Sequence, residues 1–232
     1  AADDMEGRRT GTPGQKKAAK YIARHFKQIG LKPPVKNGKS MSYYQPFSLK
    51  STKWKEVYVD AGGQRYRFLK DVFALGVSVM QAPLTCQVVF AGNGLLEEMR
   101  MARVKGRGVV YFAKSHAEAV KKGKVATSLG AKALFVLRAK TKKQYRDLLN
   151  YNAYYVKRWV GPKLSKKTTK SEVVFYVSPR LAAQMLNTQE STLTSGQLPI
   201  GARGQNVRAL ATQEEKITLA SENVMGLLEG TT

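Results

Sequence analysis

A strand, a helix and a second strand are predicted by residues 104–137, which read VKGRGVVYFAKSHAEAVKKGKVATSLGAKALFVL. The apolar run at 109–113 follows a glycine-rich turn, and the apolar run at 134–137 follows shortly after Gly130. Between them, small and apolar residues recur at helical spacing over 117–129. Two strands joined by a helix form a parallel crossover, so this stretch predicts a parallel pair of strands within the fold.

The rest of the chain predicts more strands than helices, and the fold class is therefore α/β in the mixed α+β sense. Alternating residues at 55–60 and 65–69, with two glycines between them, indicate a hairpin. The segment 141–170 has no readable period. The predicted strands outside residues 104–137 are 41–49, 55–60, 65–69, 72–80, 84–91, 173–177, 207–210 and 217–219.

One amphipathic helix is predicted near the N-terminus. Thr12 can cap it, Pro13 suits its first turn, and Gly30 ends it. Lysines and arginines occupy one face, and the other face carries an apolar stripe that needs a partner. The residues of that stripe are Ala18, Tyr21, Ile22, Phe26 and Ile29.

Two short motifs lie near the ends of the chain. Residues 5–14 read MEGRRTGTPG, and residues 221–230 read SENVMGLLEG. Together they resemble the start of the catalytic domain of the zinc aminopeptidases with two co-catalytic metal ions, the family that includes glutamate carboxypeptidase and the transferrin receptor. The sequence between them resembles, mainly in its order of elements over 105–137, the protease-associated (PA) domain that many members carry as an insert.

The resemblance implies a discontinuous organisation. It implies a flank of the peptidase domain at 1–48, a PA insert with a β-sandwich-like core at 49–219, and a returning strand at 220–232. The two flanks must then be adjacent, and antiparallel pairing of the strands 42–49 and 222–229 would achieve this.

The resemblance also implies a function. In the family, a His-x-Asp motif follows the second flank and supplies the first metal ligands, and this chain ends before such a motif. We therefore expect a fragment truncated before the metal ligands, without turnover, that acts in substrate access or protein interaction. The implied partners are the missing catalytic domain and, through it, peptide substrates. Two zinc ions are implied for the full parent and none for this chain. The implied location is secreted or periplasmic, with any signal peptide removed or absent.

The residues that carry the resemblance predict structural rather than catalytic roles. The glycines suit turns, Thr12 suits a helix cap, and Glu6 and Arg8 can form a local charge pair. The signature residues are Glu6, Gly7, Arg8, Gly11, Thr12, Gly14, Glu222, Asn223 and Gly226.

No catalytic or metal-binding residue is predicted. The two histidines, His25 and His116, have no second ligand at metal-binding spacing. Ser178 lies between a strand and a helix, but it lacks the flanking glycines of a nucleophile elbow, so we expect it to cap the helix. Cys86, the only cysteine, lies in an apolar run and is predicted to be a small core residue.

The net charge of +24 leaves an alternative open, that of a basic module for polyanions or a cell-surface ligand. Residues 101–200 hold 20 Lys or Arg against 4 Asp or Glu, and tyrosines are interspersed among the basic residues of 141–170. Such rings can stack on bases or sugars. The possible polyanion surface is Lys142, Lys143, Lys166 and Lys167, and we expect weak binding.

No apolar run reaches the ~20 residues of a membrane span.

Overall fold

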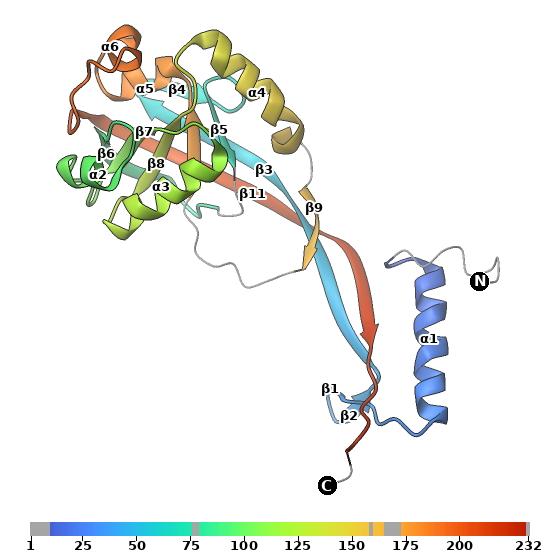
Figure 1. The fold of residues 1–232 in the computed structure, drawn as a ribbon. Coiled ribbons are helices and arrows are strands. Elements are labelled where there is room, and N and C mark those ends of the chain that lie inside the picture. The colour runs from blue at the N-terminus through green and yellow to red at the C-terminus, as the bar shows by residue number, and fades with distance from the viewer. Residues whose placement is uncertain (1–9, 76–78, 158–159, 165–172, 231–232) are drawn as a thin grey trace. The chain divides into compact units, whose positions relative to one another are not determined.

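A computed structural model of the chain describes residues 10–75, 79–157, 160–164 and 173–230 (Figure 1). Its strands form a large mixed sheet with helices between them, which confirms the predicted mixed α+β class.

The chain divides into two compact units, and each is described by itself. The first unit holds residues 1–52, 160–166 and 215–232, and the second holds 53–159 and 167–214. The predicted module bounds, 1–48, 49–219 and 220–232, stay a prediction.

The sheet of the second unit is one path of strands in the order β4-β3-β11-β6-β7-β8-β10-β5. Two of these strands, β3 and β11, also contribute residues to the first unit. The bounds are β3 (Tyr44–Ala61), β4 (Gln64–Arg67), β5 (Val72–Leu75), β6 (Leu84–Phe90), β7 (Gly108–Phe112), β8 (Ala133–Leu137), β10 (Val174–Val177) and β11 (Arg203–Val224).

The centre of this sheet is parallel. Strand β7 pairs in parallel with β6 on one side and β8 on the other, and β10 pairs in parallel with β8. The helix α3 (His116–Ser128) connects β7 to β8, and the Ser115 side chain caps it by accepting from the Glu118 N–H. The predicted crossover over residues 104–137 is therefore confirmed.

The core of the second unit lies on this parallel centre. Every residue of β8 and of β10 is buried, as expected for strands covered on both faces. Helix α3 packs on β8 and β10, and α5 (Pro179–Met185) packs on β8. Burial of this apolar surface is the main stabilising contribution, at roughly 25 cal/mol per Å².

The remaining helices of the second unit are α2 (Leu96–Met101), α4 (Lys142–Lys157) and α6 (Glu190–Thr194). Helix α4 occupies much of the segment that had no readable period. Its inward side carries the buried Tyr145, Asn152 and Val156, and its other positions are mostly polar. This narrow buried stripe explains why the sequence pattern was weak.

Two pairs of predicted strands are single long strands, which corrects the sequence analysis. Predicted strands 41–49 and 55–60 merge into β3, and 207–210 and 217–219 merge into β11. The two long strands are neighbours in the sheet. Backbone hydrogen bonds between them do not depend on the side chains, so each strand continues across its polar residues. The predicted hairpin after β3 is confirmed: Gly62 and Gly63, both with positive φ, turn the chain into β4.

The first unit contains α1 (Pro13–Gln28), the hairpin of β1 (Val35–Asn37) and β2 (Ser40–Ser42), and β9 (Val160–Leu164), which pairs with β3. The two flanks are adjacent here, as expected, but β11 ends at Val224, so the expected strand 222–229 continues only to that residue. The Met225 N–H donates to the Tyr43 carbonyl at 2.8 Å, and the Asn223 amide donates to the Gln45 side chain at 3.1 Å.

Much of the apolar stripe of α1 is exposed, as expected for a stripe whose partner is missing. The helix begins and ends as predicted, with Thr12 as its cap. However, its buried residues are Gly14, Ala19 and Ala23, whereas Tyr21 and Ile29 are more than half exposed. Of the predicted stripe, Phe26 is partly buried and its ring lies 6.4 Å from that of Tyr43.

Candidate functional site

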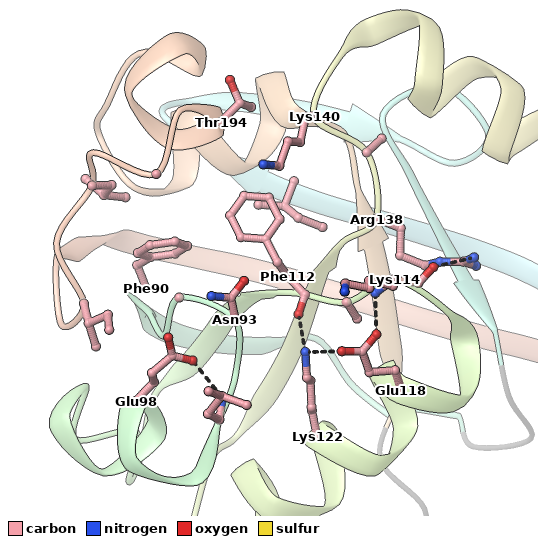
Figure 2. Close-up of a pocket in the computed structure, with 18 residues that line it drawn as sticks. Phe90, Asn93, Glu98, Phe112, Lys114, Glu118, Lys122, Arg138, Lys140 and Thr194 are labelled. Atoms are coloured by element: carbon pink, nitrogen blue, oxygen red, sulfur yellow. Dashed lines mark hydrogen bonds and ion pairs between the residues drawn. The ribbon is translucent and has the colours of Figure 1, made fainter.

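A cavity of about 740 Å³ lies at the carboxyl ends of β6, β7 and β8 in the second unit (Figure 2). Parallel strands end at the same edge of a sheet, and ligands of open α/β sheets bind at this edge. The volume falls within the range of ordinary small-ligand pockets. This cavity is the candidate site.

The loop after β6 forms one wall of the cavity. Gly92 has a φ of +54°, and its carbonyl accepts from the Phe112 N–H at 2.9 Å. A Cβ at Gly92 would lie 2.8 Å from the Glu98 Oε1 atom. This position therefore requires glycine, both for its backbone conformation and for the close approach of Glu98.

Lys122 and Glu118 form an ion pair in the cavity, and each also forms a hydrogen bond with the backbone. The Lys122 ammonium contacts Glu118 Oε1 at 2.5 Å and donates to the Phe112 carbonyl at 3.0 Å. The second Glu118 oxygen accepts from the Lys114 N–H at 2.7 Å. The hydrogen bond from Lys122 and, to a smaller extent, the one from the Lys114 N–H hold the pKa of Glu118 below its usual range. This pair fixes the loop after β7.

Three other cations of the cavity have no carboxylate partner among the described residues. They are Lys114, Arg138 and Lys140. Arg138 donates to the Lys114 carbonyl at 3.4 Å, and its buried Nε has no acceptor within the described chain. The Lys140 ammonium lies 5.9 Å from the centre of the Phe112 ring. The cavity therefore carries positive charge that an anionic ligand would neutralise.

The cavity also has an apolar wall. The Phe90 and Phe112 rings meet edge to face, with centroids 6.0 Å apart. Leu95, Leu198 and Ile200 complete this wall. Figure 2 shows Lys140 passing over the Phe112 ring, whereas Arg138 lies beside Lys114. The arrangement suits a ligand that combines an anionic group with an apolar body.

A histidine lies near the cavity and contacts a buried tyrosine. His116 Nδ1 lies 2.5 Å from the Tyr176 hydroxyl. Burial, and then the Arg138 charge, lower the pKa of His116, and burial raises the pKa of Tyr176. Both shifts favour the uncharged forms, so a hydrogen bond joins a neutral imidazole to a protonated hydroxyl.

The structure places the described signature residues in the first unit, whereas the residues that line the cavity belong to the second. Gly11 has a φ of +81°, and a Cβ there would lie 2.6 Å from Leu219. Glu222 forms an ion pair with Lys16, and Gly226 packs against Leu31 and Phe26. Thr12 caps α1, Gly14 is buried in it, and Asn223 bonds Gln45. Glu6, Gly7 and Arg8 lie outside the described residues. The role of the set as family markers stays a prediction.

The predicted polyanion residues are only partly described. Lys142 and Lys143 are exposed in the first turn of α4, and Lys166 and Lys167 lie outside the described residues. Two exposed tyrosines lie on the same helix, Tyr151 at 76% and Tyr154 at 58% exposure.

The residues expected to be non-catalytic have ordinary structural contacts. Ser178 caps α5 by accepting from the Leu181 N–H at 3.1 Å, as predicted. Cys86 is buried, as predicted, and burial raises the pKa of its thiol. His25 is exposed and stacks on Tyr21.

The described part of the chain does not fit the two zinc ions that the resemblance implies for the parent. It holds no group of three or more His, Cys, Asp or Glu side chains placed to ligate a metal. We therefore derive no chemical step through zinc.

Among the described helices, none is both long and apolar enough to span a bilayer.

The sequence analysis missed the cavity residues. Lys114, Arg138 and Lys140 each follow closely on an apolar strand that was predicted, at 109–113 or 134–137. Because neighbouring parallel strands end at one edge, basic residues just beyond two such strands were the available signal.

No family model and no curated protein sequence matches the chain. Among solved structures, it is similar to an aminopeptidase from Aneurinibacillus sp. strain AM-1, with 20% identity and a TM-score of 0.44 over 94% of this chain and 43% of that one. It is also similar to BSAP, a zinc aminopeptidase from Bacillus subtilis, with 17% identity and a TM-score of 0.42 over 99% and 45% of the two chains.

A third similar structure is a peptidase M28 precursor from Shewanella amazonensis, with 11% identity and a TM-score of 0.37 over 92% and 45% of the two chains. The chain thus spans less than half the length of each of these proteins.

Proposed function

We propose that this chain is a binding module of a larger aminopeptidase-like protein, and that it acts through its cavity without turnover of its own. The observation that supports binding is the cavity at the ends of β6, β7 and β8, where cations without carboxylate partners adjoin an apolar wall. Pockets of this kind, largely apolar with a few convergent charges, are the usual form of ligand sites.

In the larger protein, the module would hold part of a peptide and so restrict which substrates reach the catalytic domain. The missing catalytic domain and its peptide substrates are the partners in this proposal, and two zinc ions belong to that domain. We place the protein outside the cytoplasm, secreted or periplasmic. The PA-domain assignment of the central residues belongs to the same proposal and rests on the order of elements around β7, α3 and β8.

Two measurements test this function. The purified chain is assayed with a panel of aminoacyl nitroanilides and analysed for metal. We expect no hydrolysis and no stoichiometric zinc. The chain is also titrated with short acetylated peptides while the amide signals of residues 90–93, 112–114 and 138–140 are followed by NMR. Shifts at these positions support binding in the cavity. Hydrolysis with bound zinc, or unchanged signals at millimolar peptide, would overturn the proposal.

A second candidate function is weak binding of polyanions through the outward face of α4. The supporting observation is that exposed Tyr151 and Tyr154 share this helix with exposed Lys142, Lys143 and Arg146, against one acidic residue, Asp147. Cations attract a phosphate or sulfate backbone, and rings stack on bases or sugars.

A further inference from the structure

We propose that the cavity binds the C-terminal end of a peptide whose last residue is apolar. The carboxylate would pair with Lys140, and the last side chain would lie on Phe90 and Phe112. This inference rests on the proposed function, because it names the ligand class of the same cavity.

The charges of the cavity select an anion. Of its two carboxylates, Glu118 is paired with Lys122 and accepts from the Lys114 N–H, and one oxygen of Glu98 accepts from the Leu95 N–H at 2.8 Å. The Lys140 ammonium, in contrast, has no carboxylate within 4.0 Å in the described chain, and lies 5.9 Å from the centre of the Phe112 ring. A cation over a ring gains about 0.5–1 kcal/mol when exposed, less than a charge-assisted hydrogen bond to an anion provides.

The apolar wall selects against a bare anion. Phosphate or sulfate would neutralise Lys140 but would leave the partly exposed ring of Phe112, which packs edge to face on the buried Phe90, uncovered. A ligand with an apolar body would also cover Leu198 and Ile200, both of which are only partly buried. Covering such surface contributes roughly 25 cal/mol per Å².

Among the groups of a peptide, the C-terminal residue joins these two properties most directly. Internal Asp and Glu side chains bring a carboxylate with only one or two methylene groups. A terminal Phe or Leu brings a carboxylate and a large apolar side chain on the same residue. The cavity, at about 740 Å³, has room for this residue and its neighbours. The exposed Asn93, another lining residue, can donate to the peptide through its amide.

The experiment compares acetyl-Gly-Gly-Phe as the free acid with the same peptide as its C-terminal amide, by NMR titration at low ionic strength. We expect the acid to bind about tenfold more tightly, the ratio given by one charge-assisted hydrogen bond. Acetyl-Gly-Gly-Gly as the free acid should bind more weakly than the Phe peptide, since it lacks the apolar side chain.

Two exposed substitutions assign the carboxylate. Lys140→Gln should bring the affinity for the acid down to that for the amide. Asn93→Asp, which adds a negative charge at the cavity and removes an amide donor, should weaken binding of the acid more than binding of the amide. Lys124→Gln, on the exposed surface of α3, is the matched control and should leave the tenfold preference intact.

The outcomes separate the inference from the proposed function. If both peptides shift the cavity signals with equal affinity, or if Lys140→Gln leaves the preference unchanged, the C-terminal assignment is wrong while binding in the cavity stands. If inorganic phosphate competes with the acid at lower concentration than acetate does, the site is a phosphate site and the inference fails. If no peptide shifts these signals, the inference and the proposed function fail together.

Discussion

The Lys140 ammonium lies 5.9 Å from the centre of the Phe112 ring, although the two residues are 28 positions apart in the chain. The contact follows from the parallel register of β7 and β8, in which Phe112 is opposite Leu137. Lys140 follows three residues after Leu137 and so reaches over the neighbouring strand end. The crossover thereby places a cation and a ring at one edge of the sheet.

Lys122→Met should destabilise the second unit. Lys122 is 14% exposed in its side chain and bonds both Glu118 and the Phe112 carbonyl. Methionine keeps the length of the side chain but leaves both acceptors without this donor, at a cost of about 1–3 kcal/mol. Urea unfolding measures the loss. Lys121→Met, on an exposed position of the same helix, is the control, and an equal effect of the two substitutions would contradict the account.

Gly11→Ala should destabilise the first unit more than Gly38→Ala does. Both glycines have positive φ, which costs an alanine roughly 1–2 kcal/mol. Only at Gly11 would the added Cβ also meet a neighbour, Leu219, at 2.6 Å; at Gly38 it meets nothing within 4 Å. The comparison follows the amide signals of α1 through urea unfolding. Equal losses would show that Leu219 moves aside without cost.

The stability of the second unit should fall as the pH falls below about 6.5, in part through His116. Its lowered pKa means that the unfolded chain binds this proton more readily than the folded chain. The stabilising contribution is complete above the ordinary pKa and is lost as the pH falls from there through the lowered value. His116→Gln should flatten this part of a plot of Tm against pH.

The control for the pH measurement is His25→Gln, at an exposed position of α1 in the other unit. It should keep the slope of the unchanged protein. The same slope in His116→Gln would show that protonation of the His116–Tyr176 pair does not contribute.

Changing Lys142, Lys143 and Arg146 together to Glu should weaken binding of heparin and of single-stranded DNA at low salt. In the unchanged protein we expect weak binding that falls steeply with salt, with a log–log slope of about −0.7 for each phosphate contacted on a single strand. Fluorescence anisotropy measures it at low and physiological ionic strength. A matched change of the exposed Lys121, Lys124 and Lys132 to Glu is the control. Equal losses in both variants would remove α4 as the binding surface and leave a general effect of charge.

Local signals predicted much of the fold. The alternation of glycine turns and apolar runs over 104–137 was sufficient for β7, α3 and β8, because each of these elements is specified by its own residues. Thr12 and Pro13 marked the start of α1 correctly. The buried face of α1 was not predictable in the same way, because Ala19 and Ala23 are buried whereas the larger Ile22 is exposed, and hydrophobicity alone favours the reverse.

The parts that were missed depend on pairing between distant segments. The polar residues within β3 and β11 break the local strand pattern. Each strand continues across them because the neighbouring strands supply its backbone hydrogen bonds. The candidate site is missed for the same reason. Arg138 and Lys140 look like solvated charges after an apolar run, and only the parallel register with β7 brings Arg138 beside Lys114 and Lys140 over the ring of Phe112.

The central claim, that the cavity at the ends of β6, β7 and β8 binds a ligand, is tested most directly by intermolecular nuclear Overhauser effects. The measurement uses isotope-labelled chain and unlabelled acetyl-Gly-Gly-Phe. The account predicts contacts from the phenylalanine ring of the peptide to Phe90, Phe112 and Ile200. Contacts confined to α1 or α4, or none at saturating peptide, would contradict it.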